Sequence, residues 1–193
     1  MKRVLLFSMT ILMLLCHTAF AGAAENFLNR HQTVGVVIVG SPDFKTQNFY
    51  EYFNGQLRSE TDTSYVIVTG NTPQNKWVDY WLDKGFLEEQ TPKKDDLLGF
   101  VSFSGYDKVL FFIVKDPIME KHTRSTGLFT QATQARVSLT TNAFLCTPDA
   151  VIKTYSVSKQ DDSEWSDMRA KIGALKKCAR DTGIEMKPYF GKI

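Results

Sequence analysis

Asp43 and Asp116 are the residues whose position in the sequence best suits chemistry. Each comes shortly after an apolar run rich in β-branched residues, residues 34–39 for Asp43 and residues 109–114 for Asp116. Such runs are typical of strands that are covered on both faces. If the two strands are parallel neighbours, both carboxylates lie at their carboxyl ends, where open α/β sheets bind ligands. The pair could then serve a small hydrolase or a metal-dependent enzyme, whereas capping or turn roles explain each aspartate on its own.

Three aromatic residues at helical spacing form a second candidate site. Trp77, Tyr80 and Trp81 stand at positions i, i+3 and i+4, so they share one face of an expected helix. One interpretation is that this face packs in the core. The other is an exposed aromatic patch that binds a protein partner, because Tyr and Trp are enriched in such patches.

A further amphipathic helix is expected from about residue 161 to residue 182. Asp161 and Glu164 have the spacing of a capping box at its start. Its apolar stripe consists of Trp165, Met168, Ile172, Leu175 and Ala179. If the stripe lies on a sheet, Trp165 and Ile172 are core residues. The alternative is that Trp165 is an exposed anchor for a partner.

Beyond residue 23 the chain has two cysteines, Cys146 and Cys178. Side chains alternate between the two sides of a strand, so Cys146 should point to the side opposite to the apolar residues of the strand expected at residues 137–145. These apolar residues should face the helix that carries Cys178. Free thiols are therefore favoured over a Cys146–Cys178 disulfide, which requires a close approach of the two Cα atoms. No motif for a cofactor or a metal site is present, so we predict neither, and a non-enzymatic role is favoured over an enzymatic one.

Residues 1–23 have the pattern of a signal peptide. Lys2 and Arg3 precede an uncharged apolar stretch, and Ala19-Phe20-Ala21 fits a cleavage site. Cleavage leaves residues 24–193 as a single periplasmic or secreted domain without a transmembrane span, and an uncleaved anchor is the alternative. The chain has 23 Lys and Arg against 21 Asp and Glu, so loss of Lys2 and Arg3 leaves 21 of each. A neutral domain has no net charge that would favour nucleic acid.

Hydrophobic periodicity predicts the elements that position these residues. Their order is β-α-β-α-α-β-β-β-α, which predicts an α/β (α+β) fold with a mixed five-stranded sheet and helices packed on it. The alternating residues 137–145 and 151–157 flank a turn at residues 147–150, a pattern typical of a β-hairpin. The polar, Thr-rich residues 117–134 are expected to form a long loop, with irregular strand ends within it as the alternative.

The strand and helix sequences resemble a superfamily of cell-envelope α/β domains. In chain order they are V-G-V-V-I-V-G, Y-V-I-V, K-V-L-F-F-I-V, A-R-V-S-L-T-T-N-A and the helical R-A-K-I-G-A-L-K-K-C. The superfamily includes the TolB amino-terminal domain, the lipoprotein activators of penicillin-binding proteins and the periplasmic domain of the curli secretion channel. The helical segment is also similar to one in uncharacterised small secreted proteins of double-membrane bacteria. The resemblance implies a non-enzymatic domain that binds another envelope protein, and it transfers no site residues.

Overall fold

The computed structural model of the chain describes residues 31–86, 90–125 and 131–191. The signal peptide expected at residues 1–23 lies outside these ranges. In chain order the elements are β1 (Gln32–Val39), η1 (Pro42–Phe44), α2 (Gln47–Leu57), β2 (Tyr65–Val68), α3 (Asn71–Asp83), α4 (Lys94–Ser104), β3 (Lys108–Val114), β4 (Ile118–Ser125), β5 (Gln131–Cys146), β6 (Val151–Ser163), α5 (Asp167–Met186) and η2 (Lys187–Tyr189).

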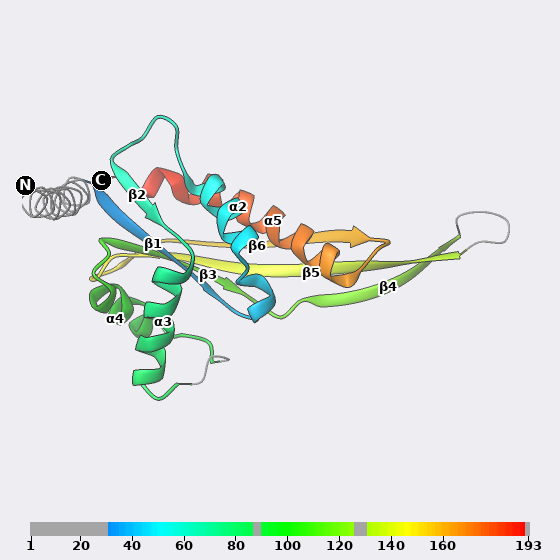
Figure 1. Cartoon of the computed structure of the whole chain (residues 1–193), viewed down its shortest axis with the longest axis horizontal. Coiled ribbons are helices and arrows are strands. Elements are labelled where there is room, and N and C mark those ends of the chain that lie inside the picture. Colours follow the sequence, from blue (N-terminus) through cyan, green and yellow to red (C-terminus); the bar gives the residue numbers. More distant parts are fainter. Residues whose placement is uncertain (1–30, 87–89, 126–130, 192–193) are drawn as a thin grey trace, which may run out of the picture.

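The strands form one mixed, six-stranded sheet. β1 pairs in parallel with β2 on one side and with β3 on the other. β3 pairs antiparallel with residues 141–146 of β5, and β4 pairs antiparallel with residues 131–138. β6 runs along the other edge of β5, so β3 and β4 share a single edge. β5 therefore extends past β3, and together with β4 it forms an arm that reaches beyond the helices (Figure 1).

Helices cover both faces of the sheet, as the sequence predicted (Figure 1). α2 and α5 pack on one face, which we call the α5 face, and α3 and α4 pack on the other, the α3 face. The side chains of β3 alternate between them: Leu110 and Phe112 belong to the core under α5, and Val109 and Phe111 to the core under α3. Every residue of β3 is buried. This explains why its sequence after Lys108 is continuously apolar rather than alternating.

The expected hairpin is confirmed, but the expected loop before it is wrong. β5 and β6 are joined by a turn in which the Thr147 N–H donates to the Ala150 carbonyl over 2.9 Å. Residues 118–125, which were expected to lie in a loop, form β4 and pair with the first half of β5. The sheet therefore has six strands instead of five. Residues 118–123 of β4 are exposed on both faces of the strand, and after Ile118 and Met119 the sequence is polar, so it lacks the apolar alternation by which strands are recognised.

The last helix also begins later than its sequence pattern suggests. β6 continues to Ser163, and α5 begins at Asp167 with Ser166 as N-cap, whose Oγ accepts the Arg169 N–H over 3.2 Å. Asp161 therefore lies in a strand, where its carboxylate accepts a hydrogen bond from Lys177 over 2.7 Å. The same carboxylate lies against Gly173 of α5, where the Cβ atom of any other residue would overlap it. The capping box expected at Asp161 and Glu164 is wrong because a serine supplies the cap.

The two cysteines lie on opposite faces of the sheet. Cys178 belongs to the core under α5 and Cys146 to the core under α3, and both thiols are free and buried. Cys146 thus points to the side of β5 away from α5, as expected from the sequence, and the sheet separates the two sulfur atoms. Burial raises the pKa of the Cys146 thiol to about 12 and also raises the pKa of Cys178.

We expect the two thiols to react only after unfolding. A raised pKa leaves almost no thiolate at neutral pH, and the thiolate is the reactive form. A thiol-reactive chromophore should therefore label the native protein, freed of residues 1–23, very slowly. In denaturant, the same unreduced protein should release two equivalents of chromophore per chain, one each from Cys146 and Cys178. No release in denaturant would contradict the free thiols.

Candidate functional site

The strand-end aspartates lie where the sequence placed them. β1 and β3 are adjacent and parallel, so the segments that follow them, carrying Asp43 and Asp116, leave the same end of the sheet. Asp43 lies in η1, and its carboxylate is 3.7 Å from the Lys171 ammonium of α5. Asp116 is exposed just after β3. The charge of Asp43 is thus used to connect η1 with α5.

No metal-binding cluster forms around these aspartates in the described part of the chain. Within residues 31–86, 90–125 and 131–191, no three His, Cys, Asp or Glu side chains gather closely enough to hold a metal ion. The partner that the structure gives to Asp43 is a cation, Lys171. This neighbour suits an ion pair rather than a general base or a metal ligand.

The aromatic residues of α3 pack in the core. Trp77, Tyr80 and Trp81 are all buried. The Trp77 and Trp81 rings stack with centroids 4.9 Å apart, and Phe111 of β3 meets Trp77 edge-on at 5.3 Å. The core interpretation of these three residues is therefore confirmed. The alternative, an exposed aromatic patch on this helix, is wrong because the sheet covers the helix face that carries them.

Trp165 is the most exposed of the large apolar residues in the described part of the chain. Its side chain is 82% exposed, so the expectation that it lies in the core is wrong, while Ile172 is half-buried. The reason is local: Trp165 precedes the N-cap Ser166, which has extended backbone at φ −168° and ψ 151°. Helical periodicity does not apply to a residue outside the helix. Of the expected stripe, Leu175 and Ala179 lie in the core under α5, whereas Met168 is exposed like Trp165.

The link that carries Trp165 is held by hydrogen bonds and a cation–π contact. The Trp165 N–H donates to Ser163 Oγ over 3.2 Å, and the Ser166 N–H donates to the same oxygen over 3.3 Å. The Arg169 guanidinium carbon lies 5.7 Å from the centroid of the Trp165 ring, within the range of a cation–π interaction. The ring is therefore exposed from an ordered turn and has a cation on one face.

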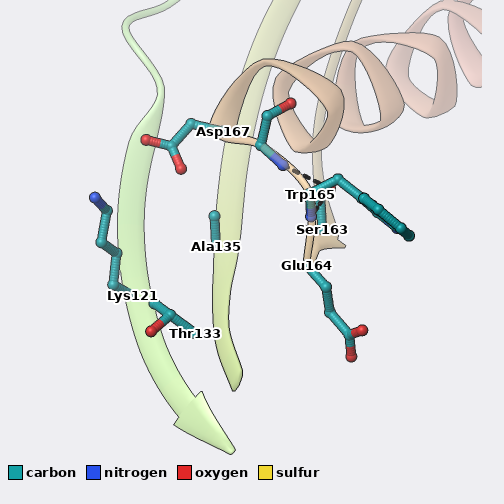
Figure 2. Close-up of a pocket in the computed structure, with 8 residues that line it drawn as sticks. Lys121, Thr133, Ala135, Ser163, Glu164, Trp165 and Asp167 are labelled. Atoms are coloured by element: carbon teal, nitrogen blue, oxygen red, sulfur yellow. Dashed lines mark hydrogen bonds between the residues drawn. The ribbon is translucent and has the colours of Figure 1, made fainter. Parts of the chain in front are cut away.

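A small pocket lies beside this link, where α5 begins (Figure 2). Its volume is about 120 Å³, well below the roughly 300–1,000 Å³ of typical ligand pockets. Asp167 points into the side on which Lys121 of β4 lies, and the Trp165 ring points the opposite way (Figure 2). The lining residues are Lys121, Thr133, Ala135, Ser163, Glu164, Trp165, Ser166 and Asp167.

Sequence reasoning missed the pocket because β4 and the start of β5 were expected to be a loop. Lys121 and Thr133 reach the pocket only through the pairing of these two strands, which places Thr123 opposite Thr133 and Lys121 opposite Ala135. One signal was present. The alternation recognised at residues 137–145 continues backwards through Ala135, which is buried, while Gln134 and Arg136 are half-exposed.

No protein-family model and no curated protein matches this sequence. Several solved structures align with the chain over most of its length. A hypothetical protein from Chlamydia trachomatis aligns over 83% of this chain and 98% of its own, with 9% identity and a TM-score of 0.42. Lipoprotein GNA1162 from Neisseria meningitidis aligns over 78% of this chain and 99% of its own, with 14% identity and a TM-score of 0.36. Rare lipoprotein B from Shewanella oneidensis aligns over 80% of this chain and 90% of its own, with 10% identity and a TM-score of 0.33.

At such low identities and TM-scores these alignments assign neither a family nor a function. The envelope superfamily that the sequence resembles stays a prediction. None of the helices in the described ranges has the length and apolar character needed to cross a membrane. The feature of this chain that bears most directly on function is the exposed Trp165.

Proposed function

We propose that the chain is an exported, non-enzymatic binding domain of the cell envelope, and that it binds another envelope protein through the surface around Trp165. This Trp165 surface consists of Trp165, Arg169 and the adjoining pocket residues Ser163, Ser166 and Asp167. The observation that carries the proposal is the 82% exposure of the Trp165 side chain. Trp and Arg are the residue types most enriched among those that dominate binding energy at protein interfaces.

The physical gain from covering Trp165 is large. A tryptophan side chain buries roughly 150–250 Å² in an interface. At about 25 cal/mol per Å², burial of this area corresponds to about 4–6 kcal/mol before the costs of association. The hydrogen bonds from Ser163 hold the link in place, so little further ordering is needed when a partner binds.

The location and the class of partner are supported by the sequence. The signal-peptide pattern of residues 1–23 supports export. The equal numbers of acidic and basic residues beyond it support a protein partner over nucleic acid, whose binding requires a basic surface. The alternative of a hydrolase or metal-dependent enzyme at Asp43 and Asp116 is less well supported, because Lys171 occupies the position beside Asp43.

Trp165→Ala should abolish partner binding without changing the stability of the fold. The ring contributes almost no buried area, so the free energy of unfolding should change by about 0.5 kcal/mol or less, as for other surface changes. Urea melts followed by circular dichroism measure this change. A loss of several kcal/mol would show that the Trp165 ring is packed in the folded protein.

Binding is tested by site-specific crosslinking in cells that export the full chain. A photo-crosslinking amino acid at position 165 should give one discrete adduct with an envelope protein. The same amino acid at position 184 should give none, because the exposed Ile184 lies near the other end of α5. Co-purification of the captured protein should be lost in Trp165→Ala and kept in Ile184→Ala. Equal adducts at both positions would contradict a specific Trp165 surface.

A further inference from the structure

Within the described ranges one edge of β6 has no pairing strand, and its outward backbone groups can be identified from the hydrogen bonds of β5. The Thr140 carbonyl accepts the Lys115 N–H over 3.0 Å, so even-numbered residues of β5 direct their backbone groups away from β6. Odd-numbered residues such as Leu139 then bond to β6, and Leu139 is opposite Lys159. Because neighbouring residues of a strand alternate in direction, the even-numbered residues of β6 direct their N–H and carbonyl groups outward.

The outward direction is independently visible at Gln160. Its carbonyl accepts a hydrogen bond from the Lys177 side chain of α5 over 2.8 Å, which is possible only if it points away from β5. Among the residues that the structure describes, no strand pairs with this edge of β6. Thr154, Ser156 and Ser158 therefore present a row of backbone donors and acceptors at the edge of the sheet. Such an edge is a template for the addition of another strand.

We propose that β6 of a second copy of this chain adds to this edge, antiparallel and about a two-fold axis at Val157. Val157 is the middle residue of β6, which runs from Val151 to Ser163, so this register pairs the strand over its whole length. Residues whose numbers add to 314 then face each other. The outward-directed residues form the hydrogen-bonded pairs, Ser156 with Ser158 of the second copy and Thr154 with Gln160.

Charge complementarity selects the same register. On the α5 face, β6 carries Lys153, Lys159 and Asp161, and the full-length register places Lys153 opposite Asp161 of the second copy. If the second strand slipped by two residues, so that residues whose numbers add to 312 faced each other, Lys153 would lie opposite Lys159 of the second copy. Like charges opposite each other are destabilising. The register of greatest overlap is therefore also one that pairs opposite charges twice, once on each side of the axis.

The charges around these two residues extend the match. Within one copy, Lys153 lies 3.7 Å from Glu185, and Asp161 lies 2.7 Å from Lys177. Across the axis, the pairing therefore creates a row of alternating sign: Glu185, Lys153, and then Asp161 and Lys177 of the second copy. Lys177 need not be displaced, because the Gln160 carbonyl has a second lone pair for the Thr154 N–H of the second copy.

Disulfide crosslinking tests both the pairing and the register. Val157 would lie opposite Val157 of the second copy in a non-hydrogen-bonded pair, where Cα atoms are about 4.5 Å apart. This distance is within the range of about 4.4–6.8 Å that a disulfide spans. Copper phenanthroline should convert Val157→Cys to a covalent dimer. Thr154→Cys is the matched control: its exposed thiol is more accessible, but in this register it faces Gln160 and should not crosslink to itself. The native thiols are buried and should add no background.

Analytical ultracentrifugation tests the hydrogen-bonded edge without a crosslink. The wild-type chain should sediment as a dimer at micromolar concentration. Ser156→Pro removes an outward N–H and leaves the β5–β6 ladder intact, so it should sediment as a monomer. Ser156→Ala loses the same hydroxyl but keeps the N–H, and should remain dimeric. A monomeric wild type, or equal crosslinking of Val157→Cys and Thr154→Cys, would overturn the proposal. Ser156→Pro leaves the Trp165 surface intact, so this failure is distinguishable from a failure of the proposed function.

Discussion

Phe112→Ala should lower the free energy of unfolding by about 3–5 kcal/mol, the usual cost of removing a buried phenylalanine ring. Phe112 lies in β3 and is fully buried. Its ring centroid is 4.7 Å from that of Phe53 and 6.1 Å from that of Phe49, both in α2. The cavity would open where α2 meets the centre of the sheet. Urea melts followed by circular dichroism and by fluorescence measure the loss.

Phe103→Ala provides the matched control, because the same atoms are removed. Phe103 lies in α4 and is 53% exposed, with its ring 5.4 Å from that of Tyr80. Its ring also lies 6.4 Å from that of Phe100. Each such aromatic pair contributes about 0.5–1.5 kcal/mol, so we expect a loss of about 2 kcal/mol or less. If the two variants lost equal stability, the core between α2 and β3 would be packed differently from the arrangement described here.

Lys108→Met should detach the segment that follows α5. The buried ammonium of Lys108, at the start of β3, donates to the carbonyls of Tyr189, Phe190 and Gly191 over 2.8, 3.1 and 2.6 Å. Burial lowers the pKa of Lys108, and the charge of Asp107 opposes this effect. Methionine keeps the apolar stem and leaves the three carbonyls without their donor. Each orphaned buried group costs about 1–3 kcal/mol. Because water can reach the three carbonyls once the segment detaches, we expect a total loss at the lower end of their sum, about 3–5 kcal/mol.

Hydrogen exchange measures the detachment directly. The amides of Lys187 and of residues 189–191 should exchange much faster in Lys108→Met, because the Phe190 ring would leave its edge-on contact with Tyr65, where the centroids are 5.4 Å apart. Lys115→Met is the control, since Lys115 is exposed just beyond the other end of β3. It should change neither the exchange nor, by more than about 0.5 kcal/mol, the stability. Unchanged exchange in Lys108→Met would show that other contacts hold the segment.

The sequence predicted those parts of the fold in which burial is complete or strictly alternating. β1 and β3 are recognisable because residues 34–39 and 108–114 are buried between two covered layers. The β5–β6 hairpin is recognisable because its inward residues alternate around a short turn. β4 was missed because its stability comes from backbone pairing with β5, which leaves no apolar pattern in its own sequence. Pairing between strands depends on the partner as much as on the strand itself.

The candidate site was predictable in position but not in contacts. Asp43 and Asp116 follow adjacent parallel strands, as expected, yet only the structure shows Lys171 beside Asp43. Trp165 was placed in the core because helical periodicity was extended through it. The start of α5 is instead set by a hydrogen bond from the Arg169 N–H to Ser166 Oγ. A single capping serine therefore decides whether Trp165 is a core residue or a surface residue.

The short turn between β5 and β6 has a consequence for the order of folding. Residues 147–150 close this hairpin locally, whereas the pairing of Val34 with Lys108 joins segments that are far apart in the chain. Closing a long loop costs more entropy than closing a short one, and hairpins form within about 1–10 μs. We therefore expect β5 and β6 to pair first and to offer β3 an edge. The parallel pairing of β1 then completes the sheet as the slow step, because non-local contacts limit folding rates.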